Sequence, residues 1–466
     1  MNYSSLALLT STVVLLKLFQ KYFNSWHRRH LPFPPGPPSY PFIGNFRDLP
    51  TKLPWLTYAK WGMQYGSDVV HASALGQHIV VVNSIKAVVE LFEKRSHIHS
   101  DRPVITMIEL LAAAVIMATL YGYEVRPSND HFVALSENAV NKFSESVFPG
   151  AAAVNTFPIL RYLPSWMPGA GFQRFAAESR QSAKEMREVP FDFAKRNMVA
   201  SNVLITPVFV HCCFQHDGVD SKSIVARLLE ANQARGRVDE IAIQEVAAVA
   251  YAAGSDTTVS ALASFFLAMA LHPDVQKKAQ TEIDTVVGIH QLPEFKDRPS
   301  LPYVEALYRE VMRWKPVLPL GLAHASSADD IYNGYFIPKG TTVFGNIWAM
   351  TRDESIYPDP ERFNPDRFFT ADRKLNDDDT ILAFGFGRRI CVGRHTADAS
   401  VWGTIVSVLS TFNIAKAKDA TGEDIDIDPK YSDAIVSHPL PFPCSIIPRS
   451  ETAKSLVQAT TMETHD

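Results

Sequence analysis

The residues Phe384-Gly385-Phe386-Gly387-Arg388-Arg389-Ile390-Cys391-Val392-Gly393 place one cysteine in a glycine-rich stretch. Glycine lacks a Cβ, so this backbone can closely approach the face of a planar ligand. A helix is predicted from Thr396 onward, and its positive end, together with the loop amides, would stabilise a Cys391 thiolate. Arg388 and Arg389 add positive charge beside the sulfur. The stretch therefore predicts one anionic sulfur ligand for a metal held mainly by another group, for which haem iron is the natural candidate. The alternative is a buried structural cysteine in a turn.

Written as F-x-x-G-x-R-x-C-x-G, the stretch resembles the haem-binding signature of the cytochrome P450 family. Three more motifs similar to those of the family precede it in the family's order: Ala253-Gly254-Ser255-Asp256-Thr257-Thr258 for A-G-x-D-T-T, Glu310-Val311-Met312-Arg313 for E-x-x-R, and Pro360-Glu361-Arg362-Phe363 for P-E-R-F. The resemblance extends over residues 32–449. It implies haem b as the cofactor, Cys391 as the axial iron ligand, and Phe384 and Gly387 as parts of the loop that contacts the haem.

Length and composition are compatible with one large helical domain. The chain has 466 residues, of which 46% are hydrophobic, and a net charge of −4, which gives no sign of nucleic-acid binding. Four cysteines do not form a disulfide framework in a chain of this length. His211-Cys212-Cys213 with His216 suggests a zinc site, but adjacent cysteines lack the two-residue spacer that zinc sites favour. We therefore do not predict zinc there.

The N-terminal region predicts a membrane anchor. Leu6 to Phe19 is mainly apolar, and a basic flank that includes Arg28 and Arg29 follows it. A signal peptide is the alternative, but no small-residue cleavage site follows. Positive charge after the apolar run keeps that side cytoplasmic. We expect an anchor with its flank at 1–30 and a proline-rich hinge at 31–45, which resembles that of microsomal family members. The resemblance thus implies a single-pass protein of the endoplasmic reticulum with a cytoplasmic catalytic domain at 46–449.

The rest of the chain predicts a mainly α fold with small β-sheets. One long helix is expected from Asp239 to His272, and another from Pro302 to the residue before Pro316. Strands are expected at 68–74 and 78–83, and Asn333-Gly334 suits the tight turn of a hairpin. The polar tail at 450–466 is expected to fray.

A polar cluster interrupts the middle of the first long helix. Gly254 lowers helix propensity, and the Thr257 and Thr258 hydroxyls can bond back to helix carbonyls. A tolerated polar patch in a core helix is the alternative to a functional site. The resemblance implies that Thr257 hydrogen-bonds the bound dioxygen and that Asp256 relays protons to it.

The resemblance also assigns supporting residues. It implies that Glu310 and Arg313 are buried against Arg362 and lock the loop beneath the haem, which is a structural role. Haem propionates require cations or strong donors. By motif match Arg389 and His324 are two of these, and Arg102 is a third candidate.

The chain departs from the family after Arg102. Relatives continue into a helix that carries W-x-x-x-R, and this chain has no such motif there, so several tens of residues of the family pattern are missing near 110–115. Two function classes therefore remain open. One is a haem-thiolate monooxygenase that inserts one oxygen atom from O2 into a small apolar substrate, a secondary metabolite or xenobiotic, with electrons from NADPH-cytochrome P450 reductase. The other is a truncated, non-catalytic remnant or splice variant at the membrane.

Overall fold

The computed structural model describes residues 31–102, 120–121, 171–200 and 223–462, together with a few residues between 131 and 142 and apart from single positions inside these ranges. Three sequence predictions lie outside the described residues. They are the membrane anchor at 1–30, the shortened region at 110–115, and the Cys212-Cys213 pair. These stay predictions.

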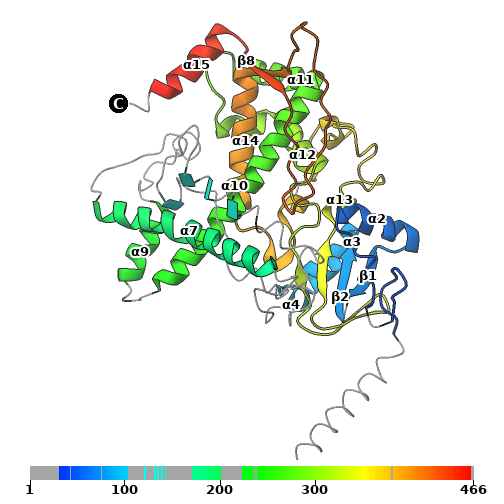
Figure 1. Ribbon diagram of the computed structural model, residues 1–466. Coiled ribbons are helices and arrows are strands. Elements are labelled where there is room, and N and C mark those ends of the chain that lie inside the picture. Colours follow the sequence, from blue (N-terminus) through cyan, green and yellow to red (C-terminus); the bar gives the residue numbers. More distant parts are fainter. Residues whose placement is uncertain are drawn as a thin grey trace, which may run out of the picture.

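Helices dominate the described residues, and the strands form only small sheets (Figure 1), which confirms the predicted fold class. The helices are α2 (Pro54–Tyr65), α3 (Ile85–Val88), α4 (Ser96–His99), α7 (Gly171–Ala200), α9 (Ile224–Ala234), α10 (Glu240–Leu271), α11 (Pro273–Val286), α12 (Pro302–Trp314), α13 (Ile347–Met350), α14 (Arg394–Thr411) and α15 (Glu451–Met462). Short 3-10 or π turns are η1 (Val89–Lys94), η4 (Phe295–Ser300), η5 (Pro365–Phe368), η6 (Ile381–Phe384) and η7 (Gly387–Arg389).

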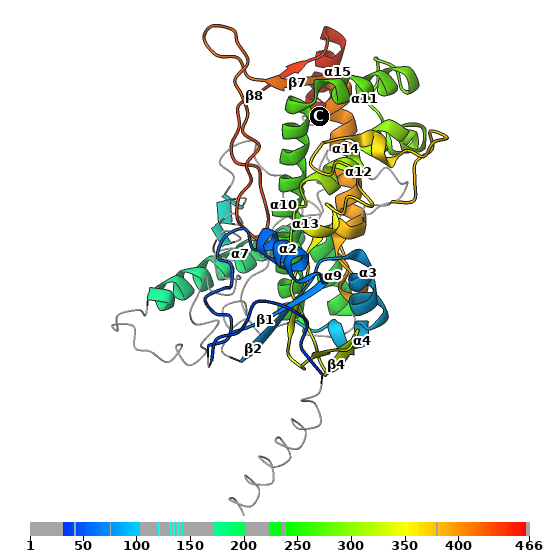
Figure 2. The same ribbon diagram turned by 90° about the vertical axis from the view of Figure 1, so that its right-hand side faces the viewer.

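Helix α10 forms the centre of the helical part. It begins at Glu240 and ends at Leu271, as its sequence predicts, because the residue before Pro273 is disfavoured in the helical conformation. Figures 1 and 2 both show α10 beside α14, and it also packs on α7, α9, α11 and α12. Within the described part of the chain, α10 is the one helix whose length and apolar composition would suit a membrane span, and 47% of its most apolar window is buried. The packing supports the prediction of a core helix.

The four-stranded sheet lies at one end of the helical part (Figure 1). Strands β1 (Val69–Ala74), β2 (Gln77–Val82), β6 (Thr342–Gly345) and β3 (His324–Ala325) form one sheet in the order β1-β2-β6-β3. Strands β1 and β2 pair antiparallel, β2 and β6 pair parallel, and β6 and β3 pair antiparallel. His324 thereby lies on the edge strand β3, beside β6 and in the same sheet as the N-terminal strands.

Two smaller ribbons complete the strands. β4 (Asp330–Tyr332) pairs with β5 (Tyr335–Ile337) through a turn in which Asn333 and Gly334 both have positive φ, so the predicted hairpin is confirmed. β7 (Phe412–Lys416) pairs with β8 (Cys444–Pro448), which closes the C-terminal segment back onto the core.

The proline-rich segment is attached to the folded body rather than standing free of it. The Pro35 carbonyl accepts a hydrogen bond of 3.0 Å from His71 N–H, and the Pro32 carbonyl accepts one of 2.8 Å from Phe336 N–H. The Phe33 ring stacks on His71 with 4.7 Å between centroids. The segment therefore extends β1 and β5 laterally, because prolines still supply carbonyl acceptors.

The expectation of a frayed tail after Arg449 was wrong for most of that segment. Residues Glu451–Met462 form helix α15, which packs on α14 and β8. Ser450 caps it by accepting a hydrogen bond from Ala453 N–H, and the preceding Arg449 forms an ion pair of 2.6 Å with Asp284. A cap and a nearby anchor stabilise a helix that its polar composition alone does not predict.

Candidate functional site

The glycine-rich stretch forms a loop that ends at the start of α14. Cys391 N–H donates a hydrogen bond of 2.8 Å to the Phe384 carbonyl, which closes the loop on itself. Phe384 is partly buried against the helical core, whereas Cys391 is exposed. Helix α14 begins three residues later, at Arg394. The loop thus presents one sulfur at the positive end of an 18-residue helix, as predicted.

Gly387 fixes the position of this loop. Its φ is +57°, and a Cβ there would collide with the Phe92 carbonyl, so a side chain is excluded on two counts. Its N–H donates a hydrogen bond of 2.6 Å to Glu93 Oε1. Sequence reasoning identified Gly387 but missed Glu93, because nothing in the sequence indicates that a carboxylate of η1 meets a loop 294 residues later.

Three residues that the sequence predicts to bind the haem propionates lie together. We call them the cation cluster, which consists of Arg102, His324 and Arg389. Arg389 Nε donates to the Ser100 carbonyl at 2.9 Å, and Arg102 Nη1 donates to the Ala323 carbonyl at 2.6 Å. His324 Nδ1 bonds to the His99 carbonyl at 2.7 Å.

Electrostatics within the cation cluster are unfavourable. Burial, and then the positive charge of Arg389, lower the pKa of the Arg102 guanidinium. Burial is the main reason that the pKa of His324 is lowered to about 4, and Arg102 and Arg389 add to the effect despite the hydrogen bond to His99. Within the described residues, all three members donate to main-chain carbonyls and none forms an ion pair with a carboxylate. An anionic ligand would therefore reduce the electrostatic repulsion between Arg102 and Arg389.

Aromatic packing connects the cluster to the glycine-rich loop. The Phe92 ring lies 4.3 Å from the His324 ring and 5.8 Å from the Phe386 ring, measured between centroids. Phe386 belongs to the loop, so the sulfur-bearing segment and the buried histidine share one rigid support.

The predicted catalytic residues lie in the middle of α10. Thr257 Oγ1 donates to the Ala253 carbonyl at 2.6 Å, and Thr258 Oγ1 donates to the Gly254 carbonyl at 2.6 Å, so the predicted back-bonding of both hydroxyls is confirmed. Within the described residues, Asp256 and Thr257 make no hydrogen bond to the 384–393 loop. Helix α10, which carries them, is connected to the loop through its packing on α14, the helix that follows the loop. Asp256 Oδ1 lies 2.9 Å from His438 Nε2. Sequence reasoning missed His438.

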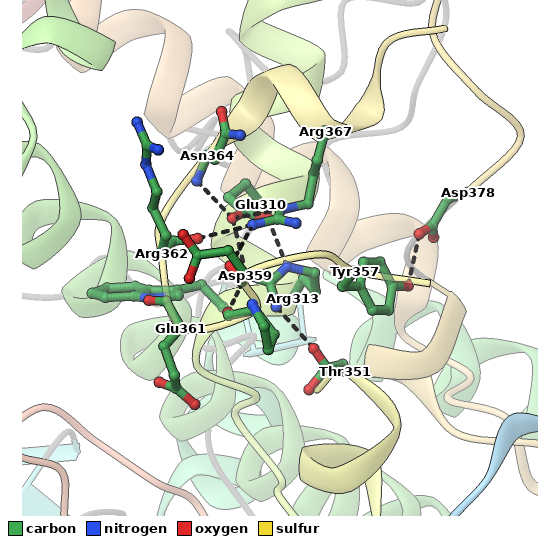
Figure 3. Close-up of polar contacts among 12 residues, drawn as sticks. Glu310, Arg313, Thr351, Tyr357, Asp359, Glu361, Arg362, Asn364, Arg367 and Asp378 are labelled. Atoms are coloured by element: carbon green, nitrogen blue, oxygen red, sulfur yellow. Dashed lines mark hydrogen bonds and ion pairs between the residues drawn. The ribbon is translucent and has the colours of Figure 1, made fainter. Parts of the chain in front are cut away.

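A buried ion-pair network, the Glu310 network, lies on α12 (Figure 3). It consists of Glu310, Arg313 and Arg367. Arg313 donates to both Glu310 oxygens, at 2.7 and 2.9 Å, and also to the Pro360 and Thr351 carbonyls. Asn364 N–H donates to Glu310 Oε1 at 2.7 Å. Every group is buried and paired, which is the condition under which a buried ion pair is tolerated.

The expectation that Arg362 completes this network was wrong. Arg362 is exposed, and Figure 3 shows its guanidinium turned away from Glu310. Arg367 occupies the third place instead, with its Nε 3.2 Å from Glu310 Oε1. The sequence holds a near-copy of the same pattern, Pro365-Asp366-Arg367-Phe368, five residues further on. Either copy fits a P-x-R-F turn, and only the packing of η5 on α12 selects the second.

Comparisons with known proteins agree with this arrangement. The family model for cytochrome P450 matches residues 104–445. Cytochrome P450 monooxygenase ple1 of Rhodocybe pseudopiperita is 38% identical over 93% of this chain and 92% of its own length. Cytochrome P450 monooxygenase 208 of Postia placenta is 37% identical over 96% of each chain. The chain belongs to the cytochrome P450 family. It is therefore an oxygen-incorporating oxidoreductase that uses haem, with a cysteine thiolate as ligand to the iron.

The residues present fit this cofactor. Cys391 is the cysteine of the family signature, and its side chain is exposed rather than packed in the core. The cation cluster places a half-buried Arg102 and an exposed Arg389, neither paired with a carboxylate among the described residues, beside the buried His324, which suits the two haem propionates. This P450 would hold the iron through Cys391 and the propionates through Arg102, His324 and Arg389.

This P450 is internally shorter than a relative that it matches from end to end. Cytochrome P450 monooxygenase 176 of Postia placenta is 33% identical over an alignment of 532 residues that covers 100% of this chain and 99% of the relative. Since this chain has 466 residues, at least 66 of the 532 positions have no residue here. The location of the missing residues near 110–115 stays a prediction.

Proposed function

We propose that this P450 inserts one oxygen atom from O2 into a small apolar substrate, a secondary metabolite or xenobiotic. Electrons would come from NADPH-cytochrome P450 reductase at the endoplasmic reticulum membrane, to which residues 1–30 would anchor the protein. The observation that carries the proposal is the exposed Cys391 sulfur on a loop locked by Gly387 and Glu93. The fungal relatives support this proposal, since both are cytochrome P450 monooxygenases by name.

Haem with a thiolate ligand supplies the activation of dioxygen once two electrons and two protons are delivered. The protons are the part that this chain's own residues provide. We assign proton delivery to Asp256 and Thr257, which interrupt an otherwise apolar helix. Thr257 Oγ1 now donates to Ala253, and a rotation about χ1 would redirect its hydroxyl. Asp256 is partly exposed, so its carboxyl can exchange protons with solvent.

The shortened chain bears mainly on whether this P450 can receive electrons from the reductase. At least 66 positions of a full-length relative have no counterpart here. If these include the W-x-x-x-R helix, one propionate partner and part of the reductase-docking surface are lost. The second candidate function is therefore a non-catalytic remnant that binds haem poorly or only interacts at the membrane.

The carbon monoxide difference spectrum of the reduced, haem-supplied protein separates these functions. We expect the Soret band of a thiolate-ligated haem in the wild type, and its loss in Cys391→Ser. Cys444→Ser is the matched control, since Cys444 is the other free cysteine among the described residues and lies in β8. A folded wild type without the band supports the remnant. Retention of the band in Cys391→Ser would exclude Cys391 as the ligand.

A further inference from the structure

A loop near the C-terminus is bound along one face of α10, in register with the predicted catalytic turn. Ser260 Oγ donates to the Ser437 carbonyl at 2.6 Å, and this contact is buried. Tyr431 Oη donates to Ser264 Oγ at 3.0 Å. Asp256, the third contact, bonds to His438 at 2.9 Å.

The helical residues of these contacts are spaced four apart, at 256, 260 and 264, so they form one stripe on α10. The loop residues run in the opposite direction, from Tyr431 to His438. The stripe ends at Asp256, one residue before Thr257. The loop is therefore held so that its histidine meets the one carboxylate in the weakened turn.

His438 is itself well positioned. Its N–H donates to Ser432 Oγ at 2.9 Å, and its carbonyl accepts from Ser432 N–H at 2.7 Å. Ser437 N–H donates to the Val317 carbonyl at 2.8 Å, which attaches the loop to the segment after α12. The His438 side chain remains 30% exposed and that of Asp256 24% exposed. The imidazole can thus reach water while it contacts the carboxylate.

Other charged groups on this loop and on α10 either have other partners or lie further along the helix. On the loop, Lys430 pairs with Asp428, and Asp433 accepts a hydrogen bond from Leu53 N–H and faces Lys52. On α10, the preceding carboxylate is Glu245, about 16 Å along the helix axis. Among the described residues, the Asp256 carboxylate has His438 as its one ion-pair partner.

We propose that His438 is a positioning and proton-exchanging residue that keeps Asp256 supplied with protons. The inference rests on the proposed role of Asp256 in this monooxygenase. As Asp256 gives up its proton toward Thr257, the protonated imidazole passes its Nε2 proton to Asp256 Oδ1. The neutral imidazole then takes one proton from water, so one proton enters from solvent for each one delivered. Histidine suits this step because it changes charge roughly between pH 5 and 8.

The first test asks whether the pair exists in solution, and it needs no turnover. Thermal unfolding of the haem-supplied protein is compared for wild type, Asp256→Asn, His438→Gln and the double variant. We expect the double variant to lose no more in Tm than the larger single loss, because both changes remove the same contact. Additive losses would show that the contact is absent and would overturn the proposal.

The second test measures the fraction of NADPH electrons released as hydrogen peroxide, with reductase and without added substrate. We expect His438→Ala to raise this fraction at least twofold, in the same direction as Thr257→Ala. His438→Gln retains an N–H donor but cannot titrate, so we expect it not to restore the wild-type fraction. The wild-type fraction should depend on pH, whereas the His438 variants should show a flatter profile.

Two controls separate this role from loop stability. Tyr431→Phe loosens the same loop about 12 Å away along α10 and should lower Tm without changing the peroxide fraction. His290→Gln changes an exposed histidine and should change neither. An unchanged peroxide fraction in His438→Ala, or full restoration by glutamine, overturns the role of His438 while the thiolate band is normal. A wild type without that band overturns the proposed function and this role with it.

Discussion

The Glu310 network and the cation cluster both gather arginines, but they differ in burial and in what neutralises the charge. The arginine side chains of the network are buried, whereas Arg102 of the cluster is half-buried and Arg389 is exposed. In the Glu310 network, one carboxylate with no exposed surface accepts from two arginines. In the cation cluster, the described partners are main-chain carbonyls. The charge of Arg389 adds to burial in lowering the pKa of Arg102, and both arginines add to burial in lowering the pKa of His324.

This difference separates a structural lock from a ligand site. Burying a charge is costly unless it is paired, so the cost of a half-buried Arg102 that has no carboxylate partner among the described residues must be offset by another gain. In the Glu310 network the gain is a fixed segment at 358–367 under the core. In the cation cluster we propose that the gain is affinity for the haem propionates. Removing one member should therefore cost fold stability in the first case and ligand affinity in the second.

The largest effect is expected for Glu310→Gln. The amide keeps the shape but leaves two buried guanidinium groups without a carboxylate, which should cost about 3–5 kcal/mol of unfolding free energy. Urea unfolding and the yield of soluble protein measure the loss. Glu361→Gln is the matched control, because the Glu361 carboxylate is 58% exposed and its pairs with Lys315 and Arg352 should contribute at most about 1 kcal/mol. Equal losses in both variants would remove the distinction between buried and exposed pairing.

The next effect tests which arginine belongs to the network. Arg367→Ala should cost about 3 kcal/mol, because Glu310 loses one partner and the Pro358 and Asp359 carbonyls lose their donor. Arg362→Ala removes an exposed side chain and should change unfolding free energy by less than about 0.5 kcal/mol. The two melting temperatures decide the assignment, and the reverse order would restore Arg362.

A smaller effect concerns pH and the cation cluster. The pKa of His324 is about 4 against an ordinary value of 6.5, so the folded state keeps this imidazole neutral where the unfolded chain protonates it. Its contribution to stability is complete above about pH 6.5 and falls as pH drops toward about 4, by about 2 kcal/mol at about pH 5. Urea unfolding of haem-free protein should show this loss, and His324→Gln should reduce it. Propionates should also reduce it, so haem-supplied protein should lose less. Identical pH profiles in all three samples would contradict the assignment.

The smallest effect is expected for Arg102→Gln. Removing a cation that faces other cations should leave the unfolding free energy within about 0.5 kcal/mol, while haem release becomes about tenfold faster because a charged hydrogen-bond partner is lost. Transfer of haem to an excess of apomyoglobin measures the rate. Arg388→Gln serves as control, since Arg388 is exposed on the same loop as Arg389. A destabilised fold with normal haem release would place Arg102 among the structural residues.

Sequence reasoning succeeded where the relevant forces act between near neighbours in the chain. The bounds of α10, the hairpin at Asn333-Gly334 and the back-bonded Thr257 all depend on residues within about one helical turn or one tight turn. The same holds for Glu310 and Arg313, which are three residues apart. Helix propensity, turn geometry and i,i+3 contact are properties of a short segment, so a short segment predicts them.

Sequence reasoning failed where two candidates were locally equivalent. Arg362 and Arg367 stand in nearly the same pattern, and the choice depends on how η5 packs against α12. The tail at 450–462 has a polar composition, yet Ser450 and Arg449 supply the cap and the anchor that make it helical. Glu93 and His438 carried no signal at all, because their partners are 294 residues away in one case and 182 in the other.

The amino-acid sequence by itself determined the family, the prediction of Cys391 as the sulfur ligand and the helix that carries Asp256 and Thr257, because each is encoded in a contiguous motif. The tertiary structure decided which distant groups pair with the charged residues and which side chain contacts Asp256. It gathered Arg102, His324 and Arg389 with no carboxylate paired to them among the described residues, gave Glu310 its second arginine, and placed His438 against Asp256. The reason is physical: the energy of a charge depends on its burial and on the partners that the fold brings within about 4 Å, and neither is a property of sequence neighbours.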